Sequence, residues 1–184
     1  MRLKSLSENR HEWFDKLSAA AESIVEGPLN VQLSLSDMLH VQGEKLKFDD
    51  VEIGDEIGPV ERVVTNPQVR RFLAIRESDP GATRFTDDEF AKSEGLPGAI
   101  VPGAMNIAMM SQLLTGWSDA VSLRKLDVVF RQPVPHGRTL LLKGIVTDKE
   151  LADGVPTLTC DVFLENEEGS KLVIGSATVI LPMA

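Results

Sequence analysis

The sequence has only one cysteine among its 184 residues, Cys160. A single thiol excludes an intrachain disulfide and a zinc site built from several thiolates. Cys160 alternates with Leu158 and Val162 in a strand-like stretch. We therefore expect it to be a small core residue rather than a nucleophile.

Long apolar runs and an excess of basic residues are also missing. No run approaches the ~20 apolar residues that cross a bilayer, and Met1 to Ser5 lead into a polar stretch without a signal-peptide core. We expect a soluble, cytoplasmic protein with no membrane partner. The net charge is −9. Because nucleic-acid affinity depends largely on Lys and Arg that neutralise phosphates, we expect no nucleic-acid partner either. A local basic patch would still suffice for a phosphorylated ligand.

The composition is that of a globular protein, and the first 46 residues have the pattern of an N-terminal helical extension. Ser5 to Glu8 has the S-x-x-E form of a capping box. Apolar residues from Trp13 to Ile24 then recur at helical spacing, and Gly27-Pro28 ends the run. This segment contains no catalytic constellation. We expect residues 47–184 to form the main domain.

Three helices are predicted in the main domain. Residues 65–68 and 86–89 have the capping and first-turn residues of two helix starts, and the second helix should end at about Glu94. Gly103 to Leu114 is apolar nearly all round, which predicts a helix buried on most sides. Asn106, Ser111 and Gln112 interrupt this helix, and polar side chains in such a helix need partners.

Alternating apolar residues predict strands in the rest of the domain. The candidate segments are 51–57, 60–64, 126–130, 139–146, 158–164 and 172–181. A turn at 167–169 joins the last two as a hairpin. One buried helix followed by several antiparallel strands predicts an α+β domain in which a sheet wraps around that helix.

The order and spacing of these motifs resemble those of the MaoC-like dehydratases, a family that includes the (R)-specific enoyl-CoA hydratases. The family signature is a helix ending in aspartate, an Asn-Pro-Ile/Leu-His stretch, a short helix ending in alanine, and His-Gly or Pro-Gly before the central helix. The corresponding residues here are Asp79, Ala91 and Pro102-Gly103. Residues 130–137 resemble the family's F-x-x-P-V-x-x-G strand and turn, and 169–182 its closing hairpin. The resemblance spans about residues 48–182 and implies a hot-dog fold.

The resemblance also implies an activity and a set of site residues. Such an enzyme adds water to, or removes it from, an acyl thioester of coenzyme A or of a carrier protein, without a metal or a separate cofactor. Asp79 matches the family's acid/base, Gly103 its oxyanion glycine and Ser111 a serine that orients the aspartate. The candidate substrate-binding residues are Arg84, Phe85, Pro102 and Met105, of which Pro102 directly precedes Gly103 and Met105 follows it by two residues. Met105 either lines an acyl tunnel or packs in the core.

The histidine of the motif is missing. Counted from Asp79 its position falls on Arg84, and counted back from Gly103 it falls on Phe85. Arginine stays protonated and phenylalanine has no proton to give, so neither is a general acid/base near neutral pH. The loss of such a group typically costs ~10²–10⁴-fold in rate.

Arg84 and His136, the latter distant in sequence from Asp79, each have two alternative interpretations. Arg84 is either a surface arginine that pairs with Asp87, Asp88 or Glu89, or a substrate-binding residue that holds a carboxylate or a phosphate. His136, in a Pro-Val-Pro-His-Gly turn, is either a solvated turn histidine or a substitute for the missing one.

Three hypotheses for function remain open. The first is a hydratase or dehydratase, atypical or weak without the histidine. The second is a non-catalytic acyl-binding subunit of a heteromeric hot-dog dehydratase whose partner supplies the complete acid/base pair. The third is an acyl-thioester binder or thioesterase that acts alone. A single wrapped sheet leaves edges that pairing would cover, so we expect a homodimer or a heteromer with another hot-dog chain.

Overall fold

The computed structural model describes residues 46–75 and 81–183. The elements in chain order are a 3-10 turn, Phe48–Asp50; β1, Glu56–Val63; α3, Asn66–Leu73; α4, Asp88–Ser93; α5, Gly103–Thr115; β2, Ser122–Phe130; β3, Thr139–Ala152; β4, Val155–Asn166; and β5, Lys171–Ile180. The predicted N-terminal helix lies outside the described residues, so residues 1–46 as a separate extension stay a prediction.

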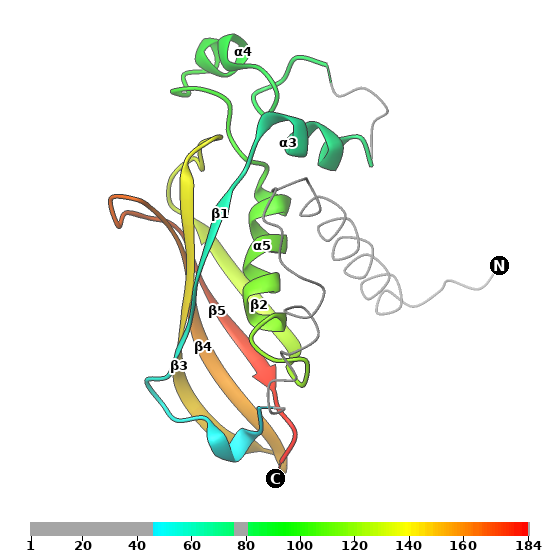
Figure 1. The fold of residues 1–184 in the computed structure, drawn as a ribbon, viewed down its shortest axis with the longest axis vertical. Helices are drawn as coiled ribbons and strands as arrows, with labels where there is room; N and C mark the ends of the chain where they lie inside the picture. Colours follow the sequence, from blue (N-terminus) through cyan, green and yellow to red (C-terminus); the bar gives the residue numbers. More distant parts are fainter. Residues whose placement is uncertain (1–45, 76–80, 184) are drawn as a thin grey trace, which may run out of the picture.

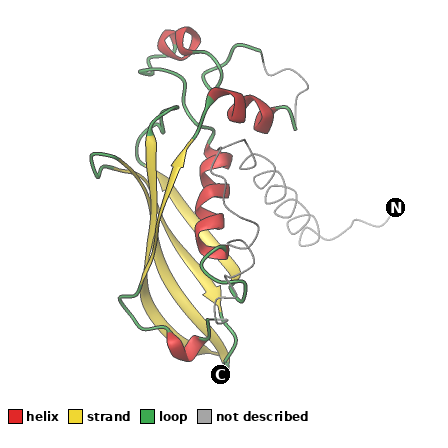
Figure 2. Cartoon of the chain, viewed as in Figure 1, coloured by secondary structure: helices red, strands yellow, loops and turns green. Residues whose placement is uncertain are grey.

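The five strands form one antiparallel sheet in the order β1-β3-β4-β5-β2. Helix α5 runs along one face of this curved sheet, and α3 and α4 lie at one end of it (Figures 1 and 2). The helix contacts β1, β2, β3 and β4. This is the predicted hot-dog arrangement, an α+β fold in which the sheet wraps around one helix.

Helix α5 supplies the centre of the core, as its apolar sequence predicts. Met110 and Leu114 are completely buried and belong to one cluster with Leu142 and Leu164 of the sheet. Burying a side chain of this size contributes roughly 1.5–3 kcal/mol. The helix ends at Gly116, whose N–H donates to the Gln112 carbonyl at 2.8 Å. The packing therefore fixes the position of the helix and of its N-terminus.

Strands β3 and β4 are longer than the sequence analysis predicted, and their pairing as a hairpin was not predicted. The two strands form a hairpin through Asp153 and Gly154, which have φ angles of 52° and 78°. Positive φ at both central residues is typical of a type I′ turn, for which Asp-Gly is a preferred pair. The later hairpin of β4 and β5 is as predicted, with Gly169 at a φ of 78°.

Helix α3 starts as predicted, but the start of α4 differs in detail. In α3 the N–H of the N-cap Thr65 donates to Oε1 of Gln68 at 2.8 Å. In α4 the N-cap is Asp87 rather than Thr86, because the Asp87 carboxylate accepts from the Phe90 N–H at 2.7 Å. The Thr86 hydroxyl instead donates to the Gly81 carbonyl at 2.7 Å.

Cys160 lies on β4 and is completely buried, which confirms its assignment to the core. Burial raises the pKa of its thiol to about 11, with the nearby Asp161 carboxylate acting in the same direction. Among the described residues no helix is long and apolar enough to cross a bilayer.

We expect Cys160 to resist thiol reagents in the native protein. A buried thiol with a raised pKa offers little thiolate and no access to the reagent. Ellman's reagent at pH 8 should label the native chain only slowly and the urea-denatured chain completely. Fast, stoichiometric labelling of the native chain would show that this part of the sheet opens readily.

Candidate functional site

A cavity of about 320 Å³ lies where the N-terminus of α5 meets the end of β2. Its apolar walls are Phe85, Ile100, Val101, Phe130, Pro133 and Val134. Gly103 and Asn106 of the first turn of α5 and Arg131 also line it. The cavity thus combines an apolar interior with a helix end and a small number of polar groups, as small-molecule sites usually do.

The N-cap residue of α5 leaves two backbone N–H groups of the first turn without a hydrogen-bond acceptor among the described residues. Pro102 is the N-cap residue and has no side-chain acceptor, and the first turn contains no acidic residue. The N–H groups of Met105 and Asn106 donate to the Pro102 carbonyl at 3.0 and 3.1 Å. Those of Gly103 and Ala104 have no acceptor among the described residues. Free N–H groups at the positive end of a helix bind negatively charged or carbonyl oxygens.

Gly103 lies directly against Phe130 of the edge strand β2. A Cβ atom placed on Gly103 would come within 3.1 Å of the Phe130 ring. The missing side chain therefore allows the aromatic ring to pack close to the start of the helix.

Asn106 is the most deeply buried polar residue in the cavity wall. It is 2% exposed, and its Oδ1 has no hydrogen-bond partner among the described residues. Buried polar atoms normally have a partner, so an unpaired oxygen beside a cavity indicates a place for a ligand or water.

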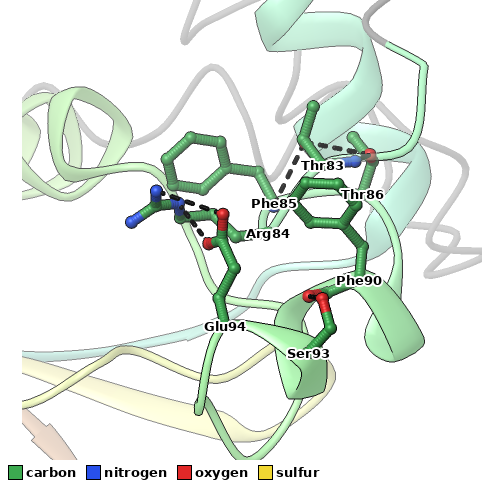
Figure 3. A network of polar contacts seen from close by, with 7 residues as sticks. All are labelled: Thr83, Arg84, Phe85, Thr86, Phe90, Ser93 and Glu94. Atoms are coloured by element: carbon green, nitrogen blue, oxygen red, sulfur yellow. Dashed lines mark hydrogen bonds and ion pairs between the residues drawn. The ribbon is translucent and has the colours of Figure 1, made fainter.

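Hydrogen bonds hold the loop that carries Phe85 (Figure 3). Oγ1 of the buried Thr86 accepts from the Thr83 N–H at 2.9 Å, and the Thr86 carbonyl accepts from the Asn66 side chain of α3 at 2.8 Å. The Ile100 N–H donates to the Arg84 carbonyl at 3.0 Å. The loop is thereby attached both to α3 and to the segment that leads into α5.

Arg84 itself does not line the cavity. Its side chain pairs with Glu94, as Figure 3 shows. Their Nε and Oε2 atoms lie 2.9 Å apart, and the Arg84 side chain is 52% exposed. The structure shows an exposed ion pair whose partner, Glu94, is none of the three acidic residues that the sequence analysis named. A substrate-binding role for Arg84 stays a prediction. Asp87 and Asp88 accept from backbone N–H groups, and Glu89 pairs with a lysine of its own helix.

The structure brings Gly103 and Phe85 together in one cavity wall, whereas the other described site residues, Arg84, Pro102, Met105 and Ser111, do not line the cavity. Met105 is buried in the core cluster. The Ser111 hydroxyl donates to the Ile107 carbonyl at 2.9 Å, within its own helix. Pro102 is buried as the N-cap of α5. Asp79 lies outside the described residues, so its catalytic role stays a prediction.

The sequence analysis did not identify Phe130 and Arg131 as lining residues. Both come from the strand end and loop whose motif resembles that of the family, but no property of their residue types distinguishes them. Asn106 did have a signal, since it is a polar residue in an otherwise apolar helix.

His136 occupies a turn, as predicted, but it is half-buried rather than solvated. Its Nε2 is buried without a partner among the described residues. Burial lowers the pKa of the imidazole and outweighs the opposite effects of the Ile100 backbone and the Asp88 carboxylate. It does not line the cavity at the start of α5.

A second cavity, of about 340 Å³, lies between β1 and the C-terminal half of α5. Arg62, Gln112 and Trp117 line it together with apolar residues. It contains no helix N-terminus and, among the described residues, no buried unpaired side-chain atom. The smaller cavity is therefore the better candidate site.

We predict that Asn106→Leu stabilises the ligand-free protein. Leucine has a similar size, and the substitution removes a buried acceptor whose missing partner costs about 1–3 kcal/mol. Urea denaturation should show a free energy of unfolding raised by about 1–2 kcal/mol. Asn66→Leu is the matched control and should destabilise, because Asn66 does hydrogen-bond to Thr86. A loss of stability in Asn106→Leu would mean that the carboxamide has a partner within the fold.

We also predict that His136 makes stability depend on pH. Its folded pKa lies below the unfolded value of 6.5, so the unfolded chain binds more protons between the two values. The stabilising contribution of the neutral imidazole is complete above pH 6.5 and is lost as the pH falls through the lowered folded value. Thermal melts should show the wild type losing more stability than His136→Gln between pH 7.5 and 5. Parallel losses would contradict this.

No protein-family model and no curated protein matches the sequence. Solved structures do match the fold. The (R)-hydratase PhaJ1 from Pseudomonas aeruginosa is 17% identical with a TM-score of 0.66, over 76% of this chain and 88% of that chain. The MaoC-like dehydratase from Rhodospirillum rubrum is 17% identical with a TM-score of 0.64, over 76% and 98% of the two chains.

A third match comes from a complex of two different subunits. It is the HadBC (3R-hydroxyacyl-ACP dehydratase) complex from Mycobacterium tuberculosis, of which one chain is 17% identical with a TM-score of 0.57, over 70% of this chain and 96% of that one. At these identities the matches establish the architecture. The chain has the hot-dog fold of the MaoC-like dehydratases and (R)-hydratases.

Proposed function

We propose that this chain binds acyl thioesters and takes part in their hydration or dehydration as a MaoC-like protein. The observation that carries the proposal is the uncapped N-terminus of α5, whose Gly103 N–H adjoins an apolar cavity. The apolar walls suit an acyl chain. Arg131 is exposed at the cavity and has no ion-pair partner among the described residues, so it suits a phosphate of coenzyme A or of a carrier's prosthetic arm.

The helix end suits the charge that this chemistry develops. Dehydration removes a proton from carbon 2 and the hydroxyl from carbon 3, which leaves as water while the double bond forms; hydration is the reverse. Negative charge collects on the thioester oxygen when the carbon 2 proton is removed. The N–H groups of Gly103 and Ala104 would stabilise that charge, assisted by the helix dipole. Asp79 is the proposed acid/base.

The missing histidine limits what the chain can do alone. Arg84 is engaged by Glu94, and Phe85 adds only an aromatic wall. Among the described residues that line the cavity, none is an aspartate, glutamate or histidine. General acid/base catalysis would therefore rest on Asp79 or on a group from another chain.

The second candidate function is that of a subunit whose partner completes the site. Within the described part of the chain, β2 is an edge strand that pairs only with β5. Its last two residues, Val129 and Phe130, are 52% and 48% exposed, and Phe130 also lines the cavity. Exposed apolar edges invite pairing with another chain. A partner on this edge would lie next to the cavity and could contribute the missing imidazole.

The test is an assay of the purified chain with a panel of 2-enoyl-CoA esters. Hydration is measured as the decrease in the absorbance of the enoyl thioester. We expect slow turnover that Asp79→Asn lowers by about 10²-fold or more. Asp153→Asn in the β3–β4 turn is the matched control and should leave the rate unchanged.

Each of the other outcomes has a definite consequence. Binding of the esters without turnover would reject the enzyme that acts alone in favour of the subunit. Equal rates for wild type and Asp79→Asn would reject Asp79 as the acid/base. If no acyl-CoA binds, the proposed function is wrong.

A further inference from the structure

Asn106 lowers the stability of the ligand-free fold unless a ligand or water binds to its unpaired side chain. The residue is 2% exposed in an otherwise apolar helix, and its Oδ1 has no partner among the described residues. Leucine would fill similar space without an unpaired acceptor. The Ser111 hydroxyl of the same helix avoids this cost by donating to the Ile107 carbonyl. Asn106 cannot be explained in that way, and its side chain borders the cavity.

The position of Asn106 relative to Gly103 specifies what kind of ligand atom it could meet. The two residues are three apart, so they lie on neighbouring positions of one helix face. At 1.5 Å per residue they are separated by about 4.5 Å along the axis. Gly103 is half-buried and Asn106 fully buried, so Asn106 is the deeper of the two. The cavity wall therefore carries the N–H group of Gly103 and, one turn farther along α5, a more deeply buried carboxamide.

An acyl thioester with an oxygen on carbon 3 has polar atoms in the same order. Its carbonyl oxygen and its carbon 3 oxygen are separated by two carbon–carbon bonds, and the remaining chain is apolar. With the carbonyl at Gly103 and the acyl chain extended along α5, the carbon 3 oxygen would lie near the next turn of the helix, which carries Asn106. A carboxamide offers both an acceptor and donors, so it can form a hydrogen bond with a hydroxyl there.

We propose that Asn106 is a specificity-determining residue that hydrogen-bonds the oxygen on carbon 3 and so favours 3-hydroxyacyl over saturated acyl thioesters. The inference rests on the proposed function, because it requires the thioester carbonyl at Gly103. It assigns Asn106 no proton transfer. The carboxamide orients the ligand, and a saturated chain leaves it unpaired. A site built to hydrogen-bond a substrate hydroxyl discriminates against the analogue that lacks it.

The test compares 3-hydroxyhexanoyl-CoA with hexanoyl-CoA, which differ only in the hydroxyl, by calorimetric titration of the full chain. We expect the wild type to bind the hydroxylated ester on the order of tenfold more tightly. Asn106→Leu should reduce that ratio to about one while it keeps or improves the affinity for hexanoyl-CoA. Asn106→Ala, which leaves space in the cavity, should lose the preference in the same way.

The matched control is Gln112→Met, which removes a carboxamide from the same helix but from the wall of the second cavity. It should keep the wild-type ratio, and thermal melts of all variants verify that each is folded. Equal affinities in the wild type, or a preference that survives both Asn106 variants, would overturn the role of Asn106 alone. Failure of both esters to bind the wild type would overturn the proposed function as well.

Discussion

The packing of α5 against the curved sheet is the constraint on which the other features depend. A helix with almost no polar face is stable in water only when it is enclosed, and β1 to β4 all contact it. Met110 and Leu114 are completely buried in the same cluster as the side chains of the sheet. The helix can neither slide nor rotate without exposing them. Its N-terminus therefore has one position relative to the end of β2 and the loop that carries Phe85.

That fixed helix end supplies the chemistry of the site. Pro102 offers no capping side chain, so two N–H groups stay unpaired among the described residues. The loop before α4 closes one side of the cavity and is held by the hydrogen bonds of Thr86 and Ile100. The preorganised donors need no rearrangement when charge develops nearby, which is the property that makes such sites effective. Asn106 adds a local cost to folding that a ligand would offset.

The hydrophobic periodicity of the sequence predicted those helices and strands whose local pattern agrees with their packing in the fold. The apolar run of α5, the proline in the first turn of α3 and the closing hairpin were all predicted correctly, because local pattern and tertiary packing agree there. The β3–β4 hairpin was missed, although Asp153-Gly154 is a recognisable turn signal. Thr86 was predicted to cap α4, but the tertiary hydrogen bonds of its loop used that hydroxyl instead.

The site was less predictable, since it depends on contacts between segments distant in the sequence. Arg84 has three acidic residues close to it in the sequence. In the fold it pairs instead with Glu94, the residue that follows α4. Nothing in a turn sequence indicates that His136 is half-buried. The sequence shows that Asn106 is polar, but only the three-dimensional structure shows that its buried oxygen has no partner among the described residues and that the residue lines a cavity. Asp79, the remaining residue of the proposed site, rests on the resemblance alone.

The most direct measurement is the change in backbone amide chemical shifts when the ¹⁵N-labelled chain is titrated with an acyl-CoA. The account predicts the largest changes at Gly103 and Ala104, because their N–H groups gain an acceptor, with smaller changes at Phe130 and Arg131. The amides of Gln112 to Trp117, at the second cavity, should hardly move. Changes centred on the second cavity, with Gly103 and Ala104 unaffected, would contradict the assignment of the α5 N-terminus as the binding site.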